Sequence, residues 1–108
     1  MLENKYQATL IRKLKKMFPG CRIQKLDTGY QQGIPDLLIL YFDCWAILEV
    51  KKSEEDRYKK LQPNQEYFVE TLNEMSFSAF IYPENEEEVL NDLQQAFEPC
   101  GSTRFPKR

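Results

Sequence analysis

Two short apolar runs separated by two residues constrain the fold of this 108-residue chain more than any other feature. The runs are Leu37–Phe42 and Trp45–Val50, and Asp43-Cys44 lies between them. Runs of about six residues, rich in branched and aromatic side chains, are typical of β-strands, and a break of about two residues predicts an antiparallel hairpin. The second run is apolar at both sets of alternating positions, so we expect a central strand that is covered on both faces.

Five further segments complete the expected fold, which is α/β with a mixed four-stranded sheet flanked by helices. We expect helices at residues 2–18, 61–75 and 86–97, strands at residues 21–26, 37–42, 45–50 and 76–82, and a mobile charged loop at residues 52–60. The predicted order is therefore α-β-β-β-α-β-α. The length suits one domain, residues 1–97, and we expect residues 98–108, with two prolines and a basic end, to form a loosely ordered tail.

The composition excludes several classes of site. The chain has no histidine, which removes histidine-based catalytic triads and histidine metal ligands. Its three cysteines, Cys21, Cys44 and Cys100, are unevenly spaced, so we expect no disulfide framework and no zinc site. No apolar run is long enough for a membrane span, and the N-terminus lacks the apolar core of a signal peptide. These features favour a reducing, cytoplasmic location.

Asp36, Glu49 and Lys51 are the strongest candidates for a site. Asp36 follows a Gly-x-Pro turn and precedes the first strand of the hairpin, while Glu49 and Lys51 share one face at the end of the second strand. The hairpin therefore brings two carboxylates and one ammonium group together, and such hard oxygen ligands suit Mg²⁺ or Mn²⁺. The alternative is an exposed strand end with an ion pair of little energetic value.

Two polar residues fall inside the apolar stripes of the expected helices. Glu3 lies within the stripe of the first helix and Gln65 within that of the second, and both need partners if they are buried. We expect Glu3 to be a third acidic member of the site and Gln65 to lie beside Glu49 and Lys51. The alternatives are that Glu3, in the first turn, is stabilised by the helix dipole, and that Gln65 caps its helix or faces water.

Basic and polar side chains suggest contacts with phosphates. Residues 1–25 hold seven basic residues and one acidic residue, although the net charge of the whole chain is −2. A basic helix face is more often simply solvated, and the loop before Asp36 is equally well explained as a simple connection. The candidate nucleic-acid contacts are Lys5, Arg12 and Lys16 on the first helix, Tyr30 and Gln31 in the loop before Asp36, and Lys52.

In order and spacing, these motifs resemble the PD-(D/E)xK nuclease superfamily. Gly33-x-Pro35-Asp36, then Glu49-Val50-Lys51, then a helix with Leu61-x-x-x-Gln65 is similar to the VRR-NUC group, and the resemblance covers roughly residues 1–82. It implies a restriction-endonuclease-like core and a divalent-metal-dependent endonuclease that hydrolyses DNA phosphodiester bonds. Minimal nucleases of this kind, found in phages and bacteria, often act as homodimers on branched or Holliday-junction-like DNA.

The resemblance also implies roles for individual residues. Asp36, Glu49 and the backbone carbonyl of Val50 would hold Mg²⁺ or Mn²⁺, and Glu3 would complete the site directly or through water. Lys51 would orient the attacking water and stabilise the phosphate, and Gln65 would fix the geometry.

Two other functions remain open at this point. The chain could be a catalytically inactive nuclease-fold module that binds DNA or a protein, although the intact Asp36, Glu49 and Lys51 argue against this. It could also be a subunit that binds another protein through its acidic C-terminal half.

Overall fold

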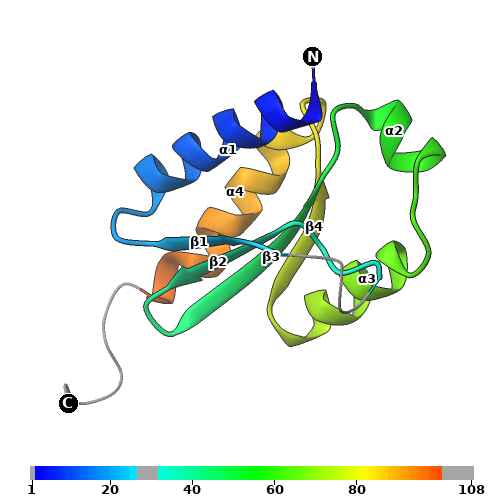
Figure 1. Cartoon of the computed structure of the whole chain (residues 1–108). Helices are drawn as coiled ribbons and strands as arrows, with labels where there is room; N and C mark the ends of the chain where they lie inside the picture. Colours follow the sequence, from blue (N-terminus) through cyan, green and yellow to red (C-terminus); the bar gives the residue numbers. More distant parts are fainter. Residues whose placement is uncertain (1, 27–31, 101–108) are drawn as a thin grey trace.

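The computed structural model describes residues 2–26 and 32–100, and over them the chain adopts an α/β fold with a mixed four-stranded sheet, as expected (Figure 1). In the described part of the chain, no helix has the length and apolar character needed to cross a membrane. The elements in chain order are α1 (Glu3–Met17), β1 (Arg22–Lys25), β2 (Leu37–Tyr41), β3 (Cys44–Val50), α2 (Glu54–Lys59), α3 (Gln65–Met75), β4 (Phe77–Ile81), α4 (Glu86–Phe97) and the 3₁₀ turn η1 (Glu98–Cys100).

The sheet has the strand order β1-β2-β3-β4, so β3 is a central strand as its apolar pattern predicts. β2 pairs antiparallel with both β1 and β3, whereas β3 and β4 are parallel. The β2–β3 hairpin turns at Phe42-Asp43, one residue before the expected position, because Tyr41 pairs with Cys44. Phe42 adopts a left-handed backbone conformation in this turn, with a φ of +54°.

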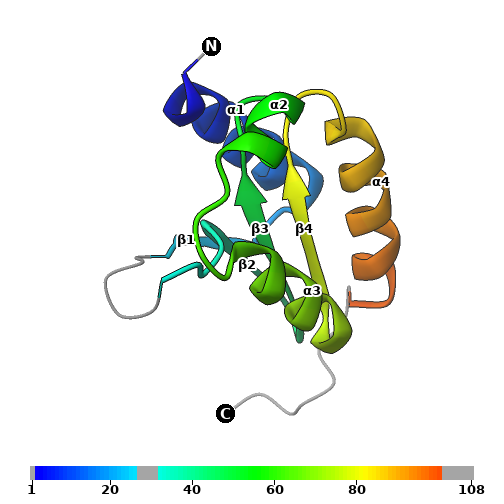
Figure 2. The same cartoon turned by 90° about the vertical axis from the view of Figure 1, so that its right-hand side faces the viewer.

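Helices cover both faces of the sheet (Figure 2). The alternate residues of β2 and β3 that include Leu37, Ile39 and Leu48 pack with the apolar sides of α1 and α4 in one continuous core. On the opposite face, α3 lies against β3 and β4, and Val69 packs with Phe80 and Tyr82. Because β3 is covered from both sides, polar side chains at its end are withdrawn from solvent.

Most of the charged segment 52–60 forms helix α2 (Glu54–Lys59), so the expectation of a loop over this segment is wrong. The side chain of Ser53 caps the helix by accepting the N–H of Asp56 at 3.1 Å. Acidic residues fill the first turn, where they complement the helix dipole. The element order is therefore α-β-β-β-α-α-β-α, with one helix more than expected.

Helix α3 begins at Gln65, four residues later than expected, and its apolar stripe is shorter. Asn64, the residue before the helix, has a φ of +71°, so the helix cannot extend back through it to Leu61. Leu61 and Met75, the apolar residues at the two ends of the expected helix, are both exposed.

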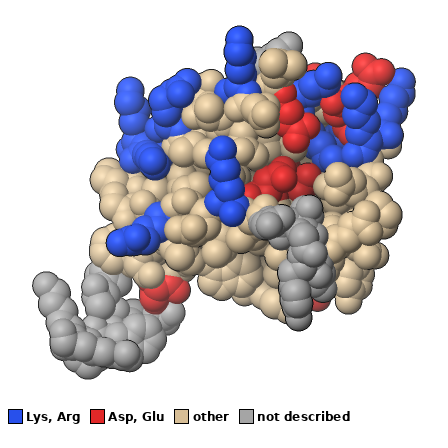
Figure 3. All heavy atoms as spheres, viewed as in Figure 1, with Lys and Arg blue, Asp and Glu red and all other residues tan. Residues whose placement is uncertain are grey.

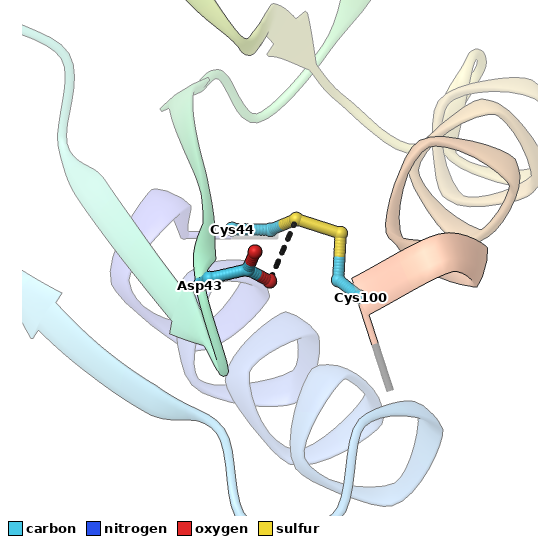
Figure 4. Close-up of side chains that lie close together, drawn as sticks. All are labelled: Asp43, Cys44 and Cys100. Atoms are coloured by element: carbon cyan, nitrogen blue, oxygen red, sulfur yellow. Dashed lines mark hydrogen bonds between the residues drawn. A yellow bond between two sulfur atoms is a disulfide. The ribbon is translucent and has the colours of Figure 1, made fainter. Parts of the chain in front are cut away.

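Cys44 and Cys100 form a disulfide, which runs against the expectation of no disulfide framework (Figure 4). The bond joins the first residue of β3 to η1, with a Cα–Cα distance of 6.0 Å. Cys100 is buried, so residues 98–100 belong to the folded domain and not to a loose tail, while residues 101–108 lie outside the described residues. The disulfide also removes the cysteine-based argument for a reducing compartment.

Reduction of this disulfide should lower the free energy of unfolding by about 2–4 kcal/mol, because the bond closes a long loop in the unfolded chain. Urea unfolding with and without dithiothreitol measures the difference. The shift should persist in Cys21→Ser, since Cys21 is a free cysteine, and disappear in Cys44→Ser. An equal response to dithiothreitol in Cys44→Ser would contradict the prediction.

Candidate active site

The hairpin brings Asp36, Glu49 and Lys51 together at one end of the sheet, as the sequence predicts. Leu37 pairs with Leu48, and this register places Asp36, just before β2, opposite Glu49. Asp36 is half-buried and is held by its backbone, whose carbonyl accepts the N–H of Leu26 at 2.7 Å. The exposed fractions of Glu49 and Lys51 are 2% and 6%, which rules out the alternative of an exposed ion pair.

The amide of Gln65 connects the buried acid to the buried base. Its Nε2 donates to Oε2 of Glu49 at 2.9 Å, and its Oε1 accepts from Nζ of Lys51 at 3.0 Å. The same Oε1 also accepts the backbone N–H of Gln62 at 3.1 Å. Gln65 is 5% exposed and lies in the first turn of α3. The structure thus confirms the predicted place of Gln65 beside Glu49 and Lys51.

Lys51 is held from two elements. Its Nζ donates to the backbone carbonyl of Lys60, directly after α2, at 2.9 Å, in addition to its bond with Gln65. The distance from this Nζ to Oε2 of Glu49 is 3.7 Å, an ion pair without a direct hydrogen bond. The ammonium group is therefore fixed in place between α2, α3 and β3.

These residues open into a cleft of about 470 Å³ at the end of the sheet. Glu3, the first residue of α1, reaches the cleft as predicted. The carboxylate oxygens of Glu3, Asp36 and Glu49 do not all lie within 4.8 Å of one another. This spacing does not favour direct ligation of one ion by all three carboxylates, and the role of Glu3, directly or through water, stays a prediction. The cleft is lined by Glu3, Leu26, Asp36, Glu49, Lys51, Asp56, Lys60, Gln62 and Gln65.

Burial raises the pKa values of all three carboxyl groups, and the charge of Asp36 adds to the rise at Glu49 and Glu3. Burial, followed by the charge of Asp36, raises the pKa of Glu49 to about 8, and Lys51 opposes this shift. Burial also raises the pKa of Asp36, against the N–H that Val50 donates to its Oδ2 at 2.9 Å. The pKa of Glu3 is raised by burial and then by Asp36. The ionised cluster is therefore short of positive charge.

The donor set fits a divalent cation. Oε1 of Glu49 is buried and accepts no hydrogen bond from a donor within the described residues. A hydrogen bond between the Asp36 and Glu49 carboxyl groups exists only while one of them carries a proton. A buried carboxylate oxygen without a partner costs free energy, and a cation beside Asp36 would supply the missing charge. Carboxylate oxygens are the ligands that Mg²⁺ and Mn²⁺ prefer. The predicted ligand role of the Val50 carbonyl stays a prediction.

A second cluster of possible metal ligands, near the β2–β3 hairpin, does not fit a metal ion. The ligand atoms of Asp43, Cys44 and Cys100 lie within 4.8 Å of one another, and the Asp43 carboxylate points toward Sγ of Cys44 (Figure 4). Sulfur atoms that are joined in a disulfide carry neither a thiolate for a metal nor a hydrogen to donate to Asp43. This group is part of the disulfide link between the hairpin and η1.

Four of the predicted phosphate contacts, Lys5, Arg12, Lys16 and Lys52, do not line the cleft. Lys5, Arg12 and Lys16 are exposed on α1, and Lys52 is half-exposed before α2. Figure 3 shows basic side chains over α1 and β1 on one side and over α2 on the other, with acidic side chains exposed between them. Tyr30 and Gln31 lie outside the described residues.

Sequence reasoning missed Asp56 on α2 and Lys60 directly after it, which both line the cleft. A local signal for their helix was present. Ser53 followed three residues later by Asp56 is a capping pattern, and Lys52, Asp56 and Lys60 are spaced by four residues. Both patterns indicate that Asp56 and Lys60 lie on one side of a helix.

No known family model, curated protein or solved structure matches this chain.

Gly33→Ala should disturb the site as well as the fold. Gly33 has a φ of +92°, and an added Cβ would lie 2.5 Å from the carbonyl oxygen of Pro63, just before the helix that carries Gln65. Gly20→Ala is a matched control, because Gly20 has a φ of +88° with no atom within 4 Å of an added Cβ. Backbone strain should cost about 1–2 kcal/mol at Gly20, and overpacking should raise the cost to about 2–4 kcal/mol at Gly33. Urea unfolding measures both costs, and equal values would contradict the prediction.

Glu49→Gln should stabilise the metal-free protein at pH 8 by about 1–3 kcal/mol, because it removes a buried charge. A carboxyl group whose pKa is raised on folding contributes its full stability below its pKa in the unfolded chain. That contribution is lost as the pH rises through the raised value of about 8. The free energy of unfolding in EDTA should therefore fall between pH 5 and pH 8 in the wild type, and fall less in Glu49→Gln.

Mn²⁺ provides an independent test of the same carboxylate. It should raise the melting temperature of the wild type more at pH 8 than at pH 5, where protons compete for Glu49. Glu49→Gln should lose most of this shift, whereas the exposed Glu55→Gln should keep it. A shift that is equal in wild type and Glu49→Gln would count against the cation site.

Proposed function

We propose that this chain is a divalent-cation-dependent endonuclease that hydrolyses phosphodiester bonds in DNA. The observation that carries the proposal is the buried network of Glu49, Lys51 and Gln65, which opens into a cleft and leaves one carboxylate oxygen without a partner. An acid, a base and an amide in one dry network are costly unless the arrangement serves chemistry or binding. The motifs that resemble the PD-(D/E)xK superfamily and its VRR-NUC group agree with this assignment.

Asp36 and Glu49 are the residues that would hold Mg²⁺ or Mn²⁺, with the Val50 carbonyl and Glu3 in support. Bound there, the cation would supply Lewis-acid chemistry that lowers the pKa of water and neutralises charge on the phosphate. The Val50 N–H fixes one oxygen of Asp36, and Gln65 fixes Oε2 of Glu49. The remaining oxygen of Glu49 is therefore held by its neighbours in one position.

Lys51 is the residue placed to act on the substrate. Its stem is buried and its Nζ is fixed by Lys60 and Gln65, so a phosphate that enters the cleft meets a preorganised positive charge. Preorganised charge stabilises the negative charge that develops in the transition state without any reorganisation during the reaction. The same ammonium group is placed to orient a water molecule for attack. Gln65 holds Lys51 and Glu49 at a constant separation.

The choice of DNA, of branched substrates and of a homodimer rests on the resemblance. The basic surfaces on both sides of the cleft support a polyanionic substrate, because phosphates are attracted to flanking lysines and arginines. Cleavage at four-way, Holliday-junction-like DNA by two protomers suits a domain with little surface of its own. A cytoplasmic location belongs to the same proposal, and the Cys44–Cys100 disulfide weighs against it.

The purified chain should nick supercoiled plasmid and a labelled four-way junction in Mg²⁺ or Mn²⁺ and not in EDTA. Asp36→Asn and Lys51→Met should each lower the cleavage rate by about 100-fold or more, because each removes a group that acts on the transition state. Single-turnover rates on both substrates measure these losses, and preference for the junction tests the substrate class.

Asp92→Asn and Lys59→Met are matched controls. They make the same changes at exposed positions outside the cleft and should leave the rate unchanged. Metal-independent DNA binding without cleavage by the wild type would refute the nuclease and favour a catalytically inactive DNA-binding module. Neither binding nor cleavage would favour a role through a protein partner.

A further inference from the structure

The carboxylate of Asp56, on α2, forms ion pairs with two lysines at the rim of the cleft. Oδ2 of Asp56 lies 3.9 Å from Nζ of Lys52 and 3.8 Å from Nζ of Lys60. Asp56 is buried and its backbone N–H donates to Oγ of the cap Ser53, which holds its main chain in place in the first turn of α2. Because both ammonium groups approach the same oxygen, they are held near each other on one side of the cleft.

The two ammonium groups face outward and keep their hydrogen-bond donors. The side chains of Lys52 and Lys60 are 40% and 66% exposed, against 11% for that of Asp56. Their distances to Asp56 exceed the 2.7–2.9 Å typical of a charge-assisted hydrogen bond. Within residues 2–26 and 32–100, neither Nζ makes a hydrogen bond. Lys51 differs sharply, since its Nζ is buried and donates to two acceptors.

A neighbouring pair shows that helix stability alone does not explain this arrangement. Lys59 and Glu55, on the same helix, form an ordinary surface ion pair at 2.9 Å, with both side chains about 70% exposed and neither lining the cleft. Asp56 and Lys60 instead line the cleft together with Glu49 and Lys51. The Lys52–Asp56–Lys60 group therefore lies beside the site, with Asp56 and Lys60 in the cleft lining and both ammonium groups open to solvent.

We infer that Lys52 and Lys60, positioned by Asp56, form a binding subsite for a backbone phosphate next to the one that is cleaved. This inference rests on the proposed function and names which surface grips the substrate. The cleft floor is rich in carboxylates and repels phosphates, so the strand must be gripped at the rim, where both lysines have free donors. Asp56 acts as a positioning residue: it holds the two ammonium groups together and does not itself contact the substrate.

The test measures binding of a labelled four-way junction in Ca²⁺ as a function of salt concentration, for wild type, Lys52→Gln, Lys60→Gln and the matched control Lys59→Gln. A phosphate contact contributes about 0.9 to the slope of log affinity against log salt for duplex DNA. Lys52→Gln and Lys60→Gln should each reduce the slope by about that amount and weaken binding several-fold. Lys59→Gln should change neither.

Asp56→Asn separates a positioning role from a structural one. Loss of the fixed carboxylate should lower the cleavage rate in Mg²⁺ about 10-fold, while the junction affinity in Ca²⁺ stays within about 3-fold, because the lysines keep their charge but lose their common position. The melting temperatures of all variants are compared, so that a folding defect is recognised separately.

The outcomes distinguish the inference from the proposed function. Equal salt slopes for Lys52→Gln, Lys60→Gln and Lys59→Gln, in a wild type that cleaves DNA, would overturn the phosphate subsite and leave the nuclease intact. A wild type that neither binds nor cleaves the junction would overturn both. A reduced slope confined to Lys52→Gln and Lys60→Gln supports the subsite.

Discussion

The amide of Gln65 is the interaction on which the site depends. Glu49 and Lys51 are both buried, and at 3.7 Å they do not bond to each other directly. An amide both donates and accepts, so Gln65 satisfies the carboxylate with its Nε2 and the ammonium group with its Oε1. Without it, two buried charges would lack partners, which costs several kcal/mol per pair. The start of α3, and the close contact of Gly33 with Pro63 and Asn64 before it, are therefore part of the site and not merely of the scaffold.

The charges of the molecule separate attraction of a substrate from the chemistry on it. Carboxylates occupy the floor of the cleft, where burial raises their pKa values and the charge of Asp36 raises those of Glu49 and Glu3 further. The floor is therefore a poor place for a phosphate and a good one for a divalent cation. Basic side chains lie instead on α1, β1 and α2 around it. Lys51 is the exception, since it is a basic residue that lies deep in the cleft among acids. A polyanion would be held from the sides and would meet Lys51 at the centre.

The sequence predicted those features that follow from local pattern and strand pairing. Apolar residues at both sets of alternating positions in residues 45–50 indicated a central strand. The hairpin then placed Asp36 opposite Glu49, in agreement with the observed strand register. Gln65 was found because a polar residue interrupted an apolar stripe. Helix α2 escaped notice because its stability comes from a cap and a few surface ion pairs, each worth little, and not from an apolar stripe. The Cys44–Cys100 bond escaped because the two residues are 56 positions apart and the folded chain brings them together.

Burial distinguishes the three residues of the site from a surface ion pair with the same sequence pattern. Asp, Glu and Lys at the end of a hairpin would form a weak surface ion pair if water reached them. Here β3 is covered on both faces, and the network formed by Glu49, Lys51 and Gln65 leaves Oε1 of Glu49 unpartnered beside the Asp36 charge. Replacing these groups with apolar side chains of similar size would increase the stability of the fold. The free-energy cost of burying these groups is instead found where an acid and a base meet an open cleft. There, an external cation and a phosphate would supply the missing opposite charges.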